Sequence, residues 1–298
     1  MMDRHFYIES NKYFEKMLKS LNYDFLDDYS FENLSKLRDI FSKISTYNGR
    51  ILYGSHVNPR EIIPTFISVI ESFGNKELLE YYKEKISSVP IRNTKYLKKS
   101  DSCLDICFLE DHIEFSAILM PRGKTRYADI ASYSHEMGHI ADMENKDKDK
   151  VDHYEFSEVL PILLEYFTFI KLLGDSGETL FYRERLGYEK NAAVVGVSSI
   201  DFLKSELGSF DEDKYYMYDV AGTNKYLLSS DFAFQFIDLL NKDRAELYRL
   251  LSSTLMGEKS VLELGNTLDI DTSGCKRLIK EYEKRMKKWV GFLVDNMI

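Results

Sequence analysis

Two histidines stand four positions apart near the middle of this 298-residue chain, in the run His135-Glu136-Met137-Gly138-His139. Because an α-helix turns by about 100° per residue, positions four apart lie one above the other, so both imidazoles can be directed at one metal ion. Glu136 projects from the adjoining face, where it can reach a water on that ion without binding the ion itself. The run therefore predicts a helix with a hydrolytic zinc site, in which His135 and His139 are ligands and Glu136 is the general base.

A catalytic zinc normally has three protein ligands and keeps a fourth position for water, so a third side chain must come from elsewhere. The related pattern with a third histidine shortly after the motif is not met, because Asp142 and Asn145 occupy those positions. A carboxylate further along the chain is expected instead. The segment that follows offers four candidate side chains: Glu158, Glu155, Glu165 and His153.

The proline at position 161 locates these candidates relative to the next helix. Proline is tolerated in the first turn of a helix, so Glu158 is expected at or just before the point where this helix begins. Glu165 follows seven positions later and would lie on the same face. Spacing alone favours Glu158 as the third ligand without excluding the other three.

Composition describes an ordinary globular protein, with 44% hydrophobic and 30% charged residues. The formal net charge of −9 argues against a nucleic-acid partner, because phosphate binding needs an excess of Lys and Arg on one face. No stretch reaches the ~18 apolar residues that a membrane span needs, and the first residues lack the apolar core of a signal peptide. The three cysteines form no CxxC pair, which indicates reduced thiols, so we expect a cytoplasmic protein. The oligomeric state is left open by the sequence.

The spacing of the apolar residues changes twice along the chain. From Tyr7 to about Ser88 they recur at three and four positions, which predicts several helices. Breaks between these helices are expected near residues 48–49, 58–59 and 74–75. Two runs rich in Ile, Leu and Phe, 103–109 and 113–120, then predict two strands joined by a tight turn. Further helices are expected over residues 129–145 (with Asp129 as its N-cap), 158–173, 230–251 and 272–298.

The segment from Asp129 to His139 resembles the active-site helix of the zinc oligopeptidases of the thimet oligopeptidase and oligoendopeptidase F family, including the glycine at position 138. Members of that family follow this helix with a glutamate ligand and a second glutamate seven residues later, an interval that Glu158 and Glu165 reproduce. The likeness covers more than the C-terminal half of the chain and includes residues 224–231, 247–257 and 268–271. The chain differs from thimet-type members in residues 209–218, expected to be a loop, which contain no histidine, and in its shorter length.

This resemblance implies a zincin-like metallopeptidase fold, mainly α with a small β-sheet, with two lobes around a cleft. It implies that one Zn²⁺ is held by the two histidines and Glu158, while Glu165 steadies a ligand. It nominates Tyr226, and Tyr218 second, as the hydrogen-bond donor to the oxyanion of the tetrahedral intermediate. Peptides are the implied substrates, with Glu136 passing a proton from the attacking water to the leaving amine.

Two other functions compete with that of an active oligopeptidase. A zincin-like module that has lost turnover could bind peptides or a partner protein, but such a role would not need the carboxylate of Glu136. A thermolysin-like peptidase has its glutamate ligand at nearly the same distance, but it also has an aspartate one turn later, where Ile162 stands.

The remaining expectations concern the organisation of the chain. Residues 1–100 are expected to form a helical N-terminal lobe and residues 101–298 the zincin-like catalytic region, together in one continuous structural domain. The strand at 115–120 could present a sheet edge to an extended peptide or could equally be internal. His56 and His112 have no ligand partner at a useful spacing and are interpreted as structural or surface residues.

Overall fold

A computed structural model provides the structure of the protein. It describes residues 57–97, 102–108, 113–123, 125–147, 156–178, 180–182, 184–185, 214–240 and 242–271, and all structural statements concern these residues. Several sequence-based predictions lie outside them: the helices before residue 57, the helix at 272–298, and the roles of His56, His112, His153 and Glu155.

A three-stranded sheet of order β1-β3-β2 lies beside the helices. The central strand β3 (Ile113–Pro121) pairs antiparallel with β2 (Cys103–Phe108) and parallel with β1 (Ile91–Thr94). The two strands predicted at 103–109 and 113–120 are therefore confirmed, whereas β1 was not predicted. Of the two alternatives left open for the strand at 115–120, the structure bears out the internal strand, because β3 pairs on both sides and the outer strands of the described sheet are β1 and β2.

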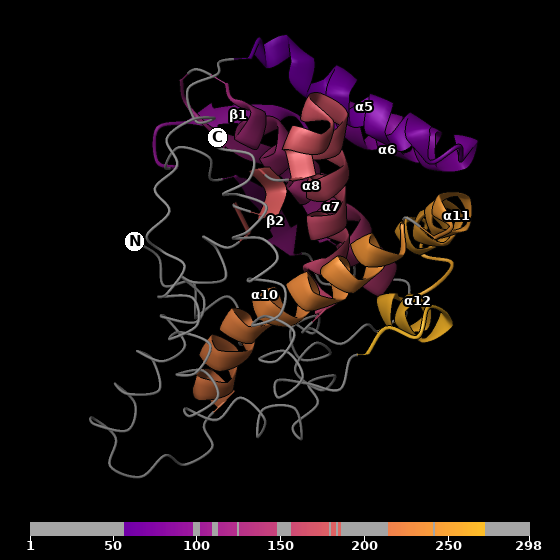
Figure 1. The fold of residues 1–298 in the computed structure, drawn as a ribbon. Helices are drawn as coiled ribbons and strands as arrows, with labels where there is room; N and C mark the ends of the chain where they lie inside the picture. The colour runs from indigo at the N-terminus through magenta and orange to yellow at the C-terminus, as the bar shows by residue number, and fades with distance from the viewer. Residues whose placement is uncertain are drawn as a thin grey trace, which may run out of the picture.

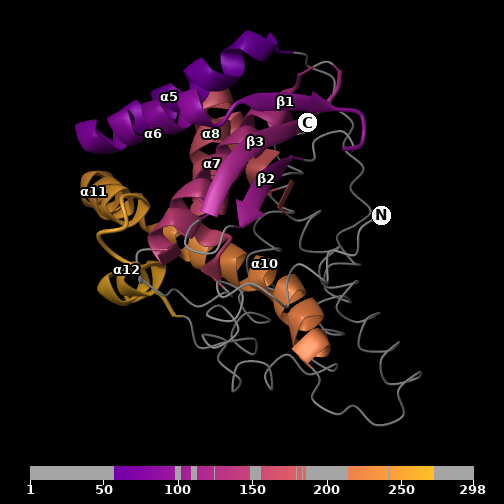
Figure 2. The ribbon, with the colours of Figure 1, turned by 180° about the vertical axis from the view of Figure 1, so that it is seen from behind.

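Two long helices, α7 (Tyr127–Asp147) and α8 (Val159–Leu173), pack along each other and form the centre of the fold. The sheet lies against α7, as Figure 2 shows from the side opposite to Figure 1. The helices α5 (Ile62–Ser72) and α6 (Lys76–Ser88) form a hairpin, and α5 contacts both α7 and α8. The expected break near residues 74–75 is confirmed, because Gly74 has a positive φ of 71° and Asn75 caps α6. The result is a mainly α-helical fold with a small β-sheet.

The sequence of α8 explains why it becomes the central helix. Every residue from Val159 to Phe169 is buried, since the helix is apolar on all sides and must be surrounded by other elements. The helix begins where the sequence predicted, with Glu158 in the N-cap position and Pro161 in the first turn. One charged residue, Glu165, is thereby carried into the core, where an ionised group needs partners.

The helix that carries the histidines begins slightly earlier than predicted. It starts at Tyr127 rather than at Asp129, so the prediction that Asp129 is the N-cap is wrong. The carboxylate of Asp129 nevertheless caps the helix from inside its first turn, because its Oδ2 accepts a hydrogen bond from the N–H of Arg126 at 2.7 Å.

After α8, the described residues 175–178, 180–182 and 184–185 are helical. The helices α10 (Lys214–Leu239), α11 (Arg244–Leu255) and α12 (Val261–Thr267) follow. The single helix predicted over 230–251 is wrong, because the chain breaks after α10 and restarts at Asp243, whose side chain caps α11. The loop expected at 209–218 is helical from Lys214 onward. In Figure 1, α10 crosses below α7 and α8, and its contact with α8 brings it to the start of that helix.

Two predictions about the whole chain can be placed on this fold. None of the helices in the described ranges combines the length and the apolar character that crossing a membrane requires. The domain boundary proposed at residue 100 stays a prediction. The strand β1 lies before that boundary, yet it pairs with β3, which lies after it.

Candidate metal and catalytic site

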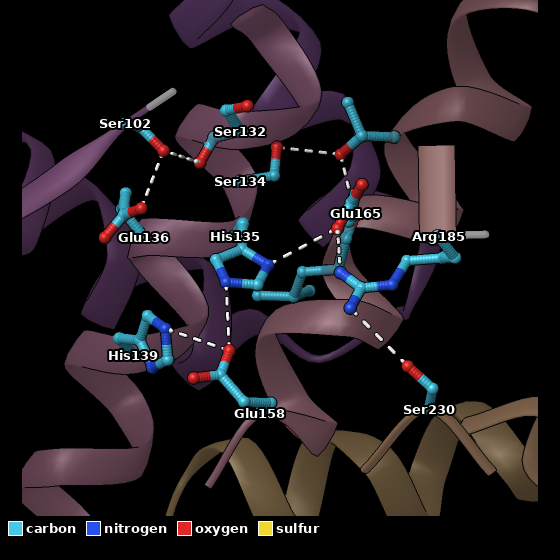
Figure 3. Close-up of polar contacts among 12 residues, drawn as sticks. Ser102, Ser132, Ser134, His135, Glu136, His139, Glu158, Glu165, Arg185 and Ser230 are labelled. Carbon is cyan, nitrogen blue, oxygen red and sulfur yellow. Dashed lines mark hydrogen bonds and ion pairs between the residues drawn. The ribbon is translucent and has the colours of Figure 1, made fainter. Parts of the chain in front are cut away.

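The two histidines of the motif lie one above the other on α7, with their ring centres 4.9 Å apart. Glu158, at the start of α8, faces both of them (Figure 3). Its Oε2 lies 3.1 Å from the Nε2 of His135 and 3.3 Å from the Nε2 of His139. The structure therefore brings the three predicted ligands together, with Glu158 1% exposed and the side chains of His135 and His139 16% and 15% exposed.

A glycine on α7 allows this approach. A Cβ at Gly138 would lie 2.6 Å from the Cα and 2.7 Å from the N of Pro161, closer than side-chain atoms pack against backbone. Only a residue without a side chain lets the first turn of α8 press against α7 at this point. Gly138 and Pro161 therefore contact each other where α7 meets α8. This contact sets the distance between the carboxylate of Glu158 and the two imidazoles.

The donor atoms of these three residues fit a zinc ion. Bond lengths of about 2.0–2.1 Å in a tetrahedral site separate neighbouring ligand atoms by about 3.3 Å. The two nitrogen-to-oxygen separations of 3.1 and 3.3 Å agree with that value, and all three ligand atoms lie within 4.8 Å of one another. Two imidazoles and one carboxylate are also a donor set typical of catalytic zinc.

The second nitrogen of His135 faces a second carboxylate. Its Nδ1 lies 3.4 Å from Glu165 Oε2, and the same oxygen accepts a hydrogen bond from Arg185 Nη1 at 3.3 Å. Burial opposes a charged imidazole, but the carboxylates of Glu158 and Glu165 outweigh it and raise the pKa of His135 to about 9. Burial also opposes ionisation of Glu165, but His135 and Arg185 outweigh it and lower the pKa of that carboxyl.

The carboxylate predicted as the general base lies on the adjoining face of α7, as the helical period requires (Figure 3). Glu136 is 6% exposed, and its Oε1 accepts a hydrogen bond of 2.6 Å from the hydroxyl of Ser102. Ser102 stands immediately before β2, and the carbonyl of Ser132 on α7, at 3.3 Å, is a second and more distant acceptor of the same hydroxyl hydrogen. This serine therefore links the start of the outer strand β2 to α7.

Both tyrosines nominated by the resemblance lie on α10. Tyr226 is half-buried and lies three residues before Ser229, whose Oγ accepts a hydrogen bond of 3.2 Å from the backbone N–H of Glu158. Tyr226 therefore shares the face of α10 that meets the start of α8. The backbone of Tyr218 also lies in α10, but its side chain is outside the described part of the structure.

Four polar residues of this site were not predicted: Ser102, Arg185, Ser229 and Ser230. They lie far from the motif in the sequence, and isolated serines or an arginine carry no spacing signal. Arg185 is 2% exposed, a burial that only the fold reveals, because arginine is mostly exposed.

The histidine pair on one helix, the carboxylate from the next helix and the small sheet beside them are arranged as expected for a zincin-like fold. The chain has an oligoendopeptidase F-like fold. A crystal structure assigned to an oligoendopeptidase F from Bacillus anthracis str. Ames superimposes with a TM-score of 0.58 at 15% identity, over 91% of this chain and 58% of the other. A 3.1 Å structure assigned to oligoendopeptidase F gives a TM-score of 0.55 at 16% identity, over 89% and 58%.

The chain thus spans 58% of the length of these solved structures. No protein-family model and no curated protein matches its sequence. At this level of identity, the structural likeness establishes the fold. Any reaction must be inferred from the side chains of the site.

Proposed function

We propose that this chain is a zinc-dependent peptidase that hydrolyses short or unstructured peptides. The observation that carries the proposal is the convergence of His135 Nε2, His139 Nε2 and Glu158 Oε2 at separations that suit a tetrahedral ion. The oligoendopeptidase F-like fold supports the same reaction class. His135, His139 and Glu158 would hold the zinc.

Each residue of the site then has a task. When bound, zinc supplies Lewis acidity, which lowers the pKa of a coordinated water and polarises the scissile carbonyl. Glu136 accepts a proton from the attacking water and delivers it to the leaving amine. The hydroxyl of Ser102 holds one oxygen of that carboxylate and leaves the other available for the proton transfer.

The oxyanion of the tetrahedral intermediate needs a hydrogen-bond donor from the protein. Tyr226 is the first candidate, since it lies on the face of α10 that meets Glu158, and Tyr218 is the second. A Phe substitution at each position separates them. The donor's Phe variant should lower kcat by about a hundredfold or more with little change in KM.

The outer strand β2 replaces β3 as the proposed support for an extended substrate. Main-chain pairing along a sheet edge holds many peptide sequences with little side-chain preference. Because Ser102 connects the start of β2 to Glu136, a peptide paired with this edge would pass the proposed base. We propose the cytoplasm as the location, since three cysteines without a CxxC pair suit a reducing compartment.

One set of measurements on the purified protein tests the proposal. Bound zinc is quantified, and cleavage of quenched fluorescent peptides of several lengths is followed with and without chelator. The native protein should contain one zinc per chain and cleave peptides, and chelator should abolish cleavage. The Glu136→Gln protein should keep its zinc but lose about a thousandfold or more in kcat, because proton transfer and water activation both depend on the carboxylate.

Two outcomes would contradict the proposal in different ways. Wild-type turnover in the Glu136→Gln protein would remove Glu136 as the base. Stoichiometric zinc without cleavage of any peptide would favour the alternative of a zincin-like module that binds peptides or a partner protein.

A further inference from the structure

Arg185 is the one arginine among the buried polar and charged residues of the described structure. It is 2% exposed, although arginine is almost never fully buried unless it is paired. Its Nη1 donates to Glu165 Oε2 at 3.3 Å, and its Nη2 donates to the Oγ of Ser230 at 3.5 Å (Figure 3). The guanidinium therefore joins α8 to α10 directly behind the metal-binding histidines.

The contact between Arg185 and Glu165 involves the oxygen that faces the metal site. Glu165 Oε2 lies 3.4 Å from His135 Nδ1 and 3.3 Å from Arg185 Nη1. A carboxylate at this position fixes the orientation of the imidazole and leaves Nε2 free to bind the ion. Glu165 is 6% exposed, so its own rotamer must be held by neighbouring groups rather than by water.

We propose that Arg185 is a positioning residue of the zinc site: it holds Glu165 Oε2 against His135 Nδ1 and thereby directs His135 Nε2 at the ion. This inference rests on the proposed function. The planar guanidinium suits the task because it donates to two acceptors in fixed directions, which a lysine ammonium does not. The resemblance accounts for Glu158 and Glu165 but assigns no role to Arg185.

The second contact of Arg185 connects this chain of residues to α10. Ser230 is fully buried, and its neighbour Ser229 accepts the backbone N–H of Glu158. Ser229 thus holds the backbone of Glu158. Ser230, the next residue of α10, holds the side chain of Glu165 through Arg185. The same helix carries Tyr226, so Arg185 also fixes the relation between the metal ligands and the proposed oxyanion donor.

A purely structural arginine would give a different result from a positioning residue. A buried ion pair is weak grounds for a stability role, because desolvation offsets much of the attraction. If Arg185 only filled and neutralised the core, its removal would change the unfolding temperature but not the geometry of a bound metal. Spectroscopy of the metal separates the two roles, since the absorption bands of Co²⁺ in the zinc site report the ligand arrangement.

The experiment compares Arg185→Met with the native chain and with Arg249→Met. Arg249 is the matched control because it also pairs with a glutamate, Glu246, but lies on the exposed surface of α11. Zinc affinity is measured by chelator competition, and the Co²⁺ spectrum is recorded for each folded protein. Arg185→Met should weaken zinc binding about tenfold or more and shift the Co²⁺ bands, whereas Arg249→Met should change neither.

A double-mutant cycle with Glu165→Gln tests whether Arg185 acts through Glu165. If it does, Arg185→Met should weaken zinc binding less than about threefold when Glu165 is already glutamine, because the two residues share one effect. An equal loss in both backgrounds, or native affinity and spectrum in Arg185→Met, would overturn the inference. If Arg185→Met does not fold, Arg185→Lys is compared with the native chain in its place. The zinc affinity of Arg185→Lys should be lower than that of the native chain but higher than that expected for Arg185→Met.

These readouts distinguish failure of the inference from failure of the proposed function. If the native chain binds no zinc, the peptidase proposal fails and the inference fails with it. If the native chain binds zinc and cleaves peptides while Arg185→Met matches it in affinity and spectrum, the inference alone is wrong.

Discussion

Glu158, the N-cap residue of α8, and Glu165, within that helix, are the same residue type, yet they contact opposite nitrogens of His135. Glu158 faces the Nε2 atoms of both histidines, whereas Glu165 faces Nδ1 of one. The difference follows from position, because Glu158 precedes the helix where α8 meets α7, and Glu165 lies two turns further into the core. One carboxylate can therefore bind the ion, while the other can only orient a ligand.

This difference predicts unequal effects of two alanine substitutions. Glu158→Ala removes a ligand and should weaken zinc binding by more than about a hundredfold. Glu165→Ala removes an orienting partner and should weaken zinc binding by about 10–100-fold. Chelator competition on the two purified proteins measures both. Native zinc affinity in Glu158→Ala would move the third ligand to another carboxylate.

A second prediction at the residue scale concerns pH. The pKa of His135 is raised to about 9 when no metal is bound, chiefly because Glu158 and Glu165 outweigh the opposing effect of burial. Zinc binds the neutral imidazole and must displace a proton at lower pH. Its apparent affinity should therefore rise about tenfold per pH unit from pH 6 and level off near pH 9.

Chelator competition across this pH range checks the prediction. The Glu165→Gln protein is the control: it loses one of the carboxylates that raise the pKa of His135, so its affinity should level off at lower pH. A pH-independent affinity in the native protein would contradict the assignment of His135 as a protonated, carboxylate-paired group in the metal-free state.

At the same scale, the sequence predicted residues whose spacing carries the information. His135, Glu136 and His139 are set by the period of one helix, whereas Glu158 was one of four candidates until the resemblance, through the interval to Glu165, singled it out. Arg185 and Ser102 were missed, because their roles depend on which elements the fold brings beside α7 and α8.

At the scale of elements, the contact between Gly138 and Pro161 controls how close α8 comes to α7. An alanine in a helix is normally favoured over glycine by about 0.5–1 kcal/mol. Here the added Cβ would meet backbone atoms at 2.6 Å, and such overpacking costs about 1–3 kcal/mol. Gly138→Ala should therefore separate the helices and move Glu158 away from the histidines.

The expected result for Gly138→Ala is a loss of zinc affinity of about tenfold or more together with a lower unfolding temperature. Gly174→Ala provides the control at the opposite end of α8, where a φ of 58° disfavours alanine but no Cβ contact occurs. It should lower stability while preserving zinc affinity. Equal affinities in all three proteins would show that this helix contact does not set the site.

Elements were predictable from the sequence where the apolar pattern was long and consistent. The helices α7 and α8 and the strands β2 and β3 fit this condition. The strand β1 has a single apolar residue, Ile91, and owes its place to pairing with β3. The break between α10 and α11 was missed because the helical spacing of apolar residues continues across it, although Asp243 is a recognisable N-cap residue.

At the scale of the whole molecule, the site joins segments that lie far apart in the sequence. Side chains from the start of β2, from α7 and α8, from Arg185 and from α10 meet in two sets of polar contacts: Ser102 with Glu136, and His135 with Glu158, Glu165 and, through Arg185, Ser230 (Figure 3). An ion bound by His135, His139 and Glu158 would add a further link between α7 and α8, the two helices at the centre of the fold.

Removal of the metal should consequently destabilise the entire described fold rather than the site alone. A ligand that binds only the folded state at a thousand times its Kd adds about 4 kcal/mol to the free energy of unfolding. The zinc-loaded native protein should therefore unfold at a lower temperature after addition of chelator, as measured by circular dichroism. In the Glu158→Ala protein, chelator should change the unfolding temperature little, because the ion is already weakly held. An equal chelator effect in both proteins would place the stabilising metal at a different site.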